Sequence, residues 1–306
     1  MVQISLTKGK KVTNMVFEKK RKVNNYLTAF LFLLPFLIVY LWFWIYPIIS
    51  GFFISFTTGS FGVDSNFAGL ENFKTMISDD KFWSALINTL YFILISTPTI
   101  VMLGLIFALI VNSKLKGTVF LRSAYFIPYM LSISVIASIW KFMLQNETGL
   151  FAEIFKQLGS SLKISWLGSW GMGWLSILIV TIWWTVGFNM ILFLAGLQEI
   201  SDELYEAADM DGANAWEKFR YITLPSLRGV TFLVVLFQII ASFKLFGQTY
   251  LITNGGPGIA TTPIVHYIYQ IAFRQWDMGY ASAVSFVLLL IIAVISIIQY
   301  KVMSKN

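Results

Sequence analysis

Long apolar runs alternate with short polar stretches along the chain. A helix needs about 20 apolar residues to cross the hydrocarbon core of a bilayer. Segments that meet this requirement lie at about 27–55, 86–111, 121–145, 173–196, 230–252 and 281–300. The pattern predicts an all-α integral membrane protein with six transmembrane helices. Residues 26–306 would form this domain, behind a basic tail at residues 1–25.

Composition supports the membrane prediction. Of the 306 residues, 57% are hydrophobic and 12% are charged, and the mean hydropathy is +0.74. A soluble domain carries roughly 25% charged residues, which its surface needs to stay dispersed. Cysteine is absent and histidine occurs once, at His266. These counts exclude a disulfide framework and a thiolate or histidine-rich metal site.

Basic residues are distributed unevenly between the two sets of connections. The tail, the second and fourth connections and the C-terminal end hold 15 of the 22 Lys and Arg residues, and the other connections hold five. Lys and Arg accumulate on the cytoplasmic side of membrane proteins. Both termini are therefore predicted to be cytoplasmic. The net charge of +7 reflects this topology, and a nucleic-acid partner is not expected.

Residues 201–225 form a polar segment between the fourth and fifth apolar runs. Ser201 is a good N-cap, Gly212 can end a first helix, and a second helix is expected from Asn214 to Pro225. An amphipathic hairpin lying on lipid is one interpretation, but it would be basic on its polar face. The first half is acidic instead, which favours docking to a protein. The acids are Glu199, Asp202, Glu203, Glu206, Asp209 and Asp211.

The stretch EAADMDGANAWEKFRYITLP resembles the EAA loop of ABC importer permeases, with the pattern E-A-A-x-x-x-G-A followed by I-x-L-P. Three further stretches, GLENF, FWSALINT and TNGGPG, are similar to the carbohydrate-importer branch of that family. The resemblance extends over nearly the whole chain from Tyr26. It implies a type I importer permease fold. The matching positions are Glu206, Ala207, Ala208, Gly212, Ala213, Ile222, Leu224 and Pro225.

In this family the EAA loop docks in a groove of a cytoplasmic ATPase. Glu206 would anchor the contact by charge, and Gly212 would permit close approach. The chain has no G-x-x-x-x-G-K-[ST] nucleotide loop, so the resemblance implies no enzyme activity or cofactor here, with ATP and magnesium bound by the partner. The implied coupling residues are Glu206, Ala207, Ala208, Asp211, Gly212, Ala213, Phe219, Leu224 and Pro225.

Two helix faces carry polar and aromatic residues at a spacing of three or four. Packing between helices is one explanation, since small polar residues are common at such contacts. The resemblance implies instead that these faces line a sugar cavity, with ring stacking and hydrogen bonds to hydroxyls. The asparagines prominent in maltose permeases are not seen on these faces, which argues against maltose itself. The residues are Thr181, Trp184, Thr185 and Phe188, then Gln238, Ala241, Ser242 and Leu245.

Two features near the outer side have alternative explanations. Lys244 lies inside the fifth predicted span, where it would extend its amine outward to the interface or, less favoured, meet an anionic substrate. Gly255, Gly256 and Pro257 form a tight turn that lies near the binding-protein surface in the family. The same turn is equally well explained by backbone requirements.

The resemblance implies a set of partners: a second homologous permease, a pair of ATPases, an extracytoplasmic binding protein and a sugar. The location would be a bacterial or archaeal plasma membrane. The main rival is a secondary transporter driven by an ion gradient, which would need ionisable residues within its spans. Apart from Arg122 at the very start of the third span, Lys141 and Lys244, the predicted spans have none. An intramembrane enzyme is discounted because His266 has no nearby catalytic partner in the sequence.

Overall fold

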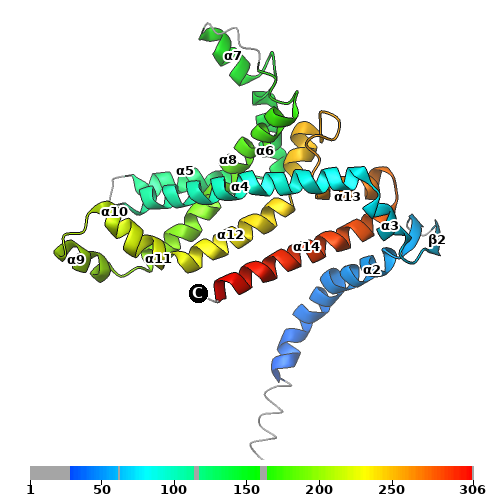
Figure 1. The fold of residues 1–306 in the computed structure, drawn as a ribbon, viewed down its shortest axis with the longest axis horizontal. Helices are drawn as coiled ribbons and strands as arrows, with labels where there is room; N and C mark the ends of the chain where they lie inside the picture. The colour runs from blue at the N-terminus through cyan, green and yellow to red at the C-terminus, as the bar shows by residue number, and fades with distance from the viewer. Residues whose placement is uncertain (1–27, 61–62, 114–116, 159–163, 305–306) are drawn as a thin grey trace, which may run out of the picture.

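The computed structural model describes residues 28–60, 63–113, 117–158 and 164–304, and this part of the chain is mostly helical (Figure 1). The basic tail predicted at residues 1–25 lies outside it. In chain order the elements are a helix over Thr28–Ile54 that includes η1 (Leu41–Ile45) and α2 (Tyr46–Ile54), the hairpin β1 (Thr57–Ser60) and β2 (Val63–Phe67), α3 (Glu71–Ile77), α4 (Asp80–Asn112), α5 (Thr118–Met130), α6 (Ile133–Met143), α7 (Leu150–Gln157), α8 (Trp170–Gln198), α9 (Asp202–Met210), α10 (Ala215–Lys218), η2 (Phe219–Thr223), α11 (Leu224–Ser226), α12 (Arg228–Phe243), η3 (Thr249–Thr253), α13 (Ile264–Arg274) and α14 (Met278–Ser304).

Within the described residues, four helices are long and apolar enough to cross a membrane. They cover the first, second, fourth and sixth segments expected from hydropathy. Two bent helix pairs bring the number of spans to six if each pair counts as one: Thr118–Met130 with Ile133–Met143 lies in the third segment, and Ala215–Ser226 with Arg228–Phe243 reaches the fifth through its second helix. The four helices are Thr28–Ile54, Asp80–Asn112, Trp170–Gln198 and Met278–Val302.

The third and fifth segments differ from the continuous spans that hydropathy predicts. α5 and α6 meet at 100°, because Leu131 and Ser132 are extended between them. The helix of the fifth segment ends at Phe243, and Leu245 and Phe246 are irregular before η3 begins. Mostly apolar residues flank both the bend after Met130 and the break after Phe243, so a hydropathy profile averages across them. Residues 121–145 and 230–252 are therefore broken elements.

Close packing of α8 against α4 and α5 forms one part of the core. Met190 and Phe193 of α8 are buried together with Ala108 of α4. A Cβ atom added at Gly187 would lie 2.0 Å from the backbone oxygen of Tyr125 in α5. Glycine at this position therefore lets the two backbones approach as closely as they do.

Hydrogen bonds hold together the end of the molecule that carries the β-hairpin and α3. The Asp79 carboxylate accepts from the phenols of Tyr267 and Tyr280, which joins the start of α4 to α13 and α14. Burial opposes the charge, but the hydrogen bonds to the carboxylate outweigh it and lower the pKa of Asp79. Nearby, the side-chain amide of Asn72 donates to the backbone oxygens of Ser55 and Thr57, both at 2.9 Å.

The opposite end of the molecule gathers α9, α10 and the C-terminal end of α14 (Figure 1). The described basic residues of the Lys- and Arg-rich connections belong to elements that reach this end, and they are Arg122, Lys218, Arg220, Arg228 and Lys301. Their placement agrees with the charge pattern. The cytoplasmic placement of this end stays a prediction.

The fit of Gly187 gives a test of the packing. In Gly187→Ala the new methyl group would force α8 away from α5, and overpacking of this kind costs about 1–3 kcal/mol. We expect a lower unfolding temperature in detergent, measured by thermal scanning. Gly171→Ala in the first turn of α8 is the control, because a Cβ atom there meets nothing within 4 Å. Equal unfolding temperatures for both variants would contradict the close approach.

Candidate functional site

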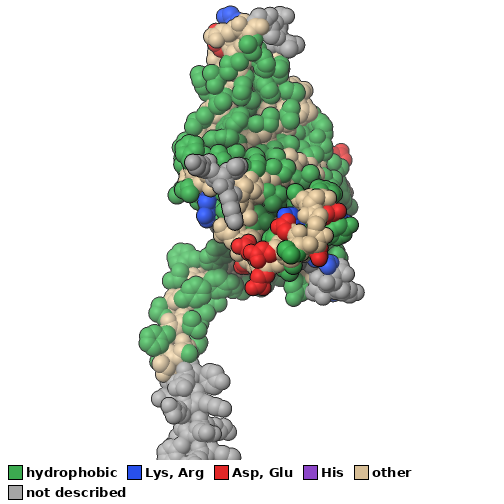
Figure 2. Space-filling view, turned by 90° about the vertical axis from the view of Figure 1, so that its left-hand side faces the viewer, with side chains coloured by type: hydrophobic (Ala, Val, Ile, Leu, Met, Phe, Trp, Pro, Cys, Tyr) green, Lys and Arg blue, Asp and Glu red, His purple; other side chains and the backbone are tan. Residues whose placement is uncertain are grey.

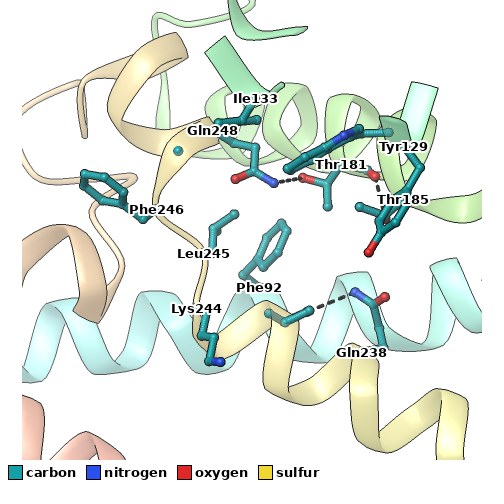
Figure 3. A pocket seen from close by; sticks show the side chains of 14 residues that line it. Phe92, Tyr129, Ile133, Thr181, Thr185, Gln238, Lys244, Leu245, Phe246 and Gln248 are labelled. Carbon is teal, nitrogen blue, oxygen red and sulfur yellow. Dashed lines mark hydrogen bonds between the residues drawn. The ribbon is translucent and has the colours of Figure 1, made fainter. Parts of the chain in front are cut away.

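A cavity of about 610 Å³ lies at the break that follows α12 (Figure 3). Its walls come from α4, α5, α6, α8, α12 and the irregular residues before η3. All of the residues considered above for the substrate pathway line it except Phe188. Those that line it are Thr181, Trp184, Thr185, Gln238, Ala241, Ser242, Lys244 and Leu245.

A chain of buried hydrogen bonds crosses between the helices at this cavity. Gln238 is at its centre: its amide nitrogen donates to the Ser242 hydroxyl at 3.2 Å, and its carbonyl oxygen accepts from Asn189 at 3.3 Å. Ser242 is 3.0 Å from the Ser96 hydroxyl of α4. α4, α8 and α12 are thus joined by polar contacts where apolar packing would be the rule. Buried polar groups persist in such an environment only when they are paired.

A second polar contact joins α8 to the segment beyond the break. The amide nitrogen of Gln248 is 3.5 Å from the Thr181 hydroxyl, which in turn donates to the backbone oxygen of Ile177 at 2.7 Å. Gln248 is buried and lines the cavity. Figure 3 shows its side chain pointing toward Thr181 across the cavity from Gln238.

The position of Lys244 differs from the favoured prediction, in which Lys244 lies within a span and extends its amine outward to the interface. Lys244 is the residue that ends α12, so it does not lie within a continuous span. It is exposed, and it lines the cavity rather than lying outside it. A cation at a helix C-terminus is favoured by the helix dipole, which helps to explain a lysine at this position.

Phe188 also differs from its prediction. It does not line the cavity but stacks on Tyr129 of α5, with ring centroids 4.9 Å apart. Tyr129 lines the cavity in its place, and Trp184 does so as predicted. The indole N–H of Trp184 is buried and has no acceptor among the described residues.

Several lining residues were not identified from the sequence. Helical spacing finds residues that share a face of one helix, but Phe92, Tyr129 and Ile133 come from other helices. Phe246, Gly247 and Gln248 lie past the break, where helical spacing from α12 no longer applies. Asn189 follows Thr185 by one helical turn, so the same spacing would have found it. It contradicts the expectation that asparagine is missing from these faces.

The lining has the chemistry of a site for a polyhydroxylated molecule. Hydroxyl and amide groups offer donors and acceptors, aromatic rings offer apolar faces, and one amine supplies positive charge. No Asp or Glu residue is among the lining residues that the structure describes. The site is therefore suited to a neutral or anionic ligand.

The segment 201–225 folds as two short helices that meet at Gly212. The Ser201 hydroxyl caps α9, and Gly212 has φ of +77°, in the left-handed region. Asn214 and Glu217 form a capping box at the start of α10, as expected for a helix start there. The predicted stop at Pro225 is slightly early, because the helical turn continues through Ser226.

The predicted coupling residues cluster at one end of the molecule. Figure 2 shows acidic side chains gathered there. Glu206, Ala207, Asp211 and Gly212 are exposed, and Leu224 and Pro225 are exposed closer to α12. Ala208, Ala213 and Phe219 are partly buried.

Exposed apolar side chains lie beside the acidic residues, and the sequence analysis did not include them among the predicted coupling residues. Met210 is 89% exposed and Trp216 is 68% exposed. An ion pair of 2.6 Å between Lys218 and Asp209 holds α10 to α9. The surface therefore combines negative charge with large apolar contacts, as protein interfaces commonly do.

The turn at Gly255, Gly256 and Pro257 is only partly available to a partner. Gly255 is buried with φ of +80°, and a Cβ atom there would lie 2.4 Å from the Thr262 hydroxyl. The Thr261 hydroxyl donates to the backbone oxygen of Gly256 at 2.8 Å. The backbone explanation therefore accounts for Gly255. Pro257 is exposed, as are the two residues that follow it.

Comparison with known proteins shows the family to which this architecture belongs. Residues 76–305 match the family described as the inner membrane component of binding-protein-dependent transport systems. The chain belongs to this family. Its relatives include a permease of the arabinooligosaccharide transport system of Bacillus subtilis (strain 168), 38% identical over 89% of this chain and 87% of the relative. A trehalose/maltose transport permease of Thermococcus litoralis is 36% identical over 92% of this chain and 96% of the relative.

A solved structure agrees in fold. The permease chain of a bacterial ABC transporter involved in the import of the acidic polysaccharide alginate matches with a TM-score of 0.83 at 22% identity, over 93% of this chain and 98% of that one. The resemblance seen in the EAA stretch is thus confirmed at the level of the family. The chain is a multi-pass membrane permease subunit with the fold of an ABC importer.

The chain contains no cysteine, so accessibility of the cavity can be tested with single substitutions. Lys244→Cys should react with a charged, membrane-impermeant thiol reagent, because position 244 is exposed to the cavity. Labelling is measured as the mass increase of the purified chain. The control is Leu94→Cys, at a position of α4 that is 73% exposed but lies outside the cavity on an apolar surface suited to lipid. Equal labelling at both positions would contradict an aqueous cavity at the break.

Proposed function

We propose that the chain is a transmembrane subunit of an ATP-driven importer of saccharides, in which it forms half of the translocation pathway. The cavity at the break of the fifth span carries this proposal. It combines hydroxyl, amide and aromatic groups inside the apolar part of a permease. Polar groups placed there cost free energy, so they commonly mark the path of a polar substrate. The relatives named for arabinooligosaccharides and trehalose/maltose support a saccharide.

ATP would act on the pathway through the segment 201–225. The exposed acids and the exposed Met210 and Trp216 form a surface that a cytoplasmic ATPase would cover. ATP and magnesium would be bound by that partner, since the sequence lacks a nucleotide loop. Closure of an ATPase pair would move this segment and open the cavity to the outside. The end of the molecule that carries the segment would then face the cytoplasm of a bacterial or archaeal cell.

Two further partners complete the proposal. A second, homologous permease would supply the other half of the pathway. An extracytoplasmic binding protein would deliver the substrate at the opposite end, with the exposed residues from Pro257 onward as one contact. One chain in a solved complex of a bacterial alginate ABC transporter with its alginate-bound periplasmic protein has the same fold, with a TM-score of 0.81 at 22% identity.

An ion-driven secondary transporter is less well supported. Coupling to an ion gradient uses ionisable groups within the spans. Between Phe82 and Asn112, within α8 and within α12 after Arg228, the described residues include no Asp, Glu, Lys or Arg. The secondary transporter would also leave the acidic segment 201–225 without a role.

The role of Trp184 in substrate binding is tested by Trp184→Ala. Loss of the ring removes both a stacking face and the buried indole N–H, which has no acceptor in the described part of the chain, so the half-saturating substrate concentration should rise about tenfold or uptake should cease. Uptake of labelled saccharides into cells gives the measurement. Trp183→Ala is the matched control, since this neighbouring indole lies outside the cavity. Unaltered uptake kinetics in the Trp184 variant would count against the assignment.

The role of the coupling segment is tested by Gly212→Asp. A Cβ atom at Gly212 meets nothing within 4 Å in this chain, and Asp tolerates the left-handed region better than most residues. The variant should therefore insert in the membrane normally yet fail to retain the ATPase and fail in uptake. Co-purification from native membranes with a tagged chain measures the retention.

A control distinguishes the partner contact from a general effect of charge. Gly117→Asp changes another left-handed glycine with open space, at the start of α5. It should retain the ATPase. A wild-type chain that purifies alone yet transports after reconstitution would overturn the proposed function and favour the secondary transporter. Normal ATPase retention and uptake in Gly212→Asp would reject the role of this glycine.

A further inference from the structure

A second cavity lies far from the first, where η2, α11 and α12 meet α14. Its volume is about 410 Å³. Arg220 of η2 and Arg228 of α12 line one side of it, and Gln299 of α14 lines another. The described lining residues include no Asp or Glu. We call this feature the arginine groove.

The arginine groove has a polar part and an apolar part. Arg220 and Arg228 are both exposed, and Thr231 adds a hydroxyl. Phe232 and Val235 of α12 continue the lining along the helix with apolar side chains. A ligand that fits both parts has an anionic group joined to a hydrocarbon chain.

The position of the groove matches the surface of a bilayer. Arg228 is the first residue of α12, and Gln299 lies near the C-terminal end of α14. Phe232 and Val235 are one and two turns deeper in α12, toward the hydrocarbon. The charged and apolar parts therefore follow each other in the same order as the head group and acyl chain of a lipid.

Gln299 adds a requirement for a hydrogen-bond donor. Its side-chain nitrogen is 3.5 Å from the backbone oxygen of Phe232, and its side-chain oxygen is buried without a donor among the described residues. A buried acceptor without a partner is costly. A head group that carries hydroxyls would supply the donor that this position lacks.

We propose that the arginine groove binds an anionic glycerophospholipid, with its phosphate at Arg220 and Arg228 and an acyl chain along Phe232 and Val235. Arginine suits this role because its planar fork of donors matches phosphate oxygens. Basic pockets between transmembrane helices commonly recognise anionic head groups. The inference is independent of the transported substrate, because the groove shares no lining residue with the cavity at the break after α12. Leu224 and Pro225 of the proposed coupling segment also line the groove.

Native mass spectrometry tests the proposal. The full chain, with any subunits that co-purify, is exchanged into micelles that contain equal amounts of phosphatidylglycerol and phosphatidylcholine. The wild type should retain phosphatidylglycerol in preference. The double variant Arg220→Gln/Arg228→Gln should retain about tenfold less of it, since each positive charge near a membrane surface contributes measurably to anionic-lipid binding.

Two further variants distinguish loss of charge in the groove from misfolding of the chain and from general attraction between cationic residues and anionic lipid. Arg220→Lys/Arg228→Lys keeps both charges and should retain more phosphatidylglycerol than the glutamine pair. Arg122→Gln removes an exposed cation of α5 that lies outside the groove and should bind lipid as the wild type does. Equal retention of both lipids by the wild type would overturn the proposal. Unchanged phosphatidylglycerol retention in the glutamine pair would also overturn it.

Discussion

Backbone groups that leave a helix inside a bilayer must find partners in protein or water, and the break after Phe243 shows how this chain meets the requirement. The amide of Lys244 is 3.1 Å from the oxygen of Ala241, and the amide of Leu245 is 3.2 Å from that of Ser242. Gly247 then lies so close to Ile133 of α6 that a Cβ atom would be 2.7 Å from its side chain. The chain is thus turned within a few residues, and the turn leaves the cavity of about 610 Å³ beside it.

The polar groups around the cavity keep the break in one arrangement. Gln238 contacts Ser242 within α12 and Asn189 across the helix boundary, so both ends of its amide are engaged. Gln248 ties the chain beyond the break back to Thr181. Replacing such a network by apolar side chains would remove the features that orient a ligand. The N–H of Trp184, which has no acceptor among the described residues, is the group through which a ligand would add to the network rather than disrupt it.

Sequence reasoning succeeded where a property belongs to one regular element. Apolar length located α4, α8 and α14, and a spacing of three or four placed Thr181, Trp184 and Thr185 on one face. It failed where tertiary contacts determine where a helix bends or ends. The bend between α5 and α6 and the end of α12 at Phe243 leave no trace in average hydropathy, because the residues on both sides are apolar. The predicted role of Lys244 followed from the assumed continuous span.

Single residues also have surroundings that the sequence could not predict. Phe188 lies at the correct spacing but stacks on Tyr129, which no periodicity in α8 could indicate. Gly255 looks like a surface turn residue, yet it is buried under Thr262. The exposed Met210 is apolar in an acidic helix, and only the fold shows that nothing within the described chain covers it.

The order of elements along the chain has a mechanical consequence. α8 and α12 both line the cavity at the break after Phe243, and the segment 201–225 is the covalent link between the two helices. In the proposed mechanism, displacing this link would move both walls at once, because each end of the link leads into one of the two lining helices. No separate element would then be needed to transmit the motion. The residues that line the cavity could therefore differ in chemistry without altering the segment that receives the motion.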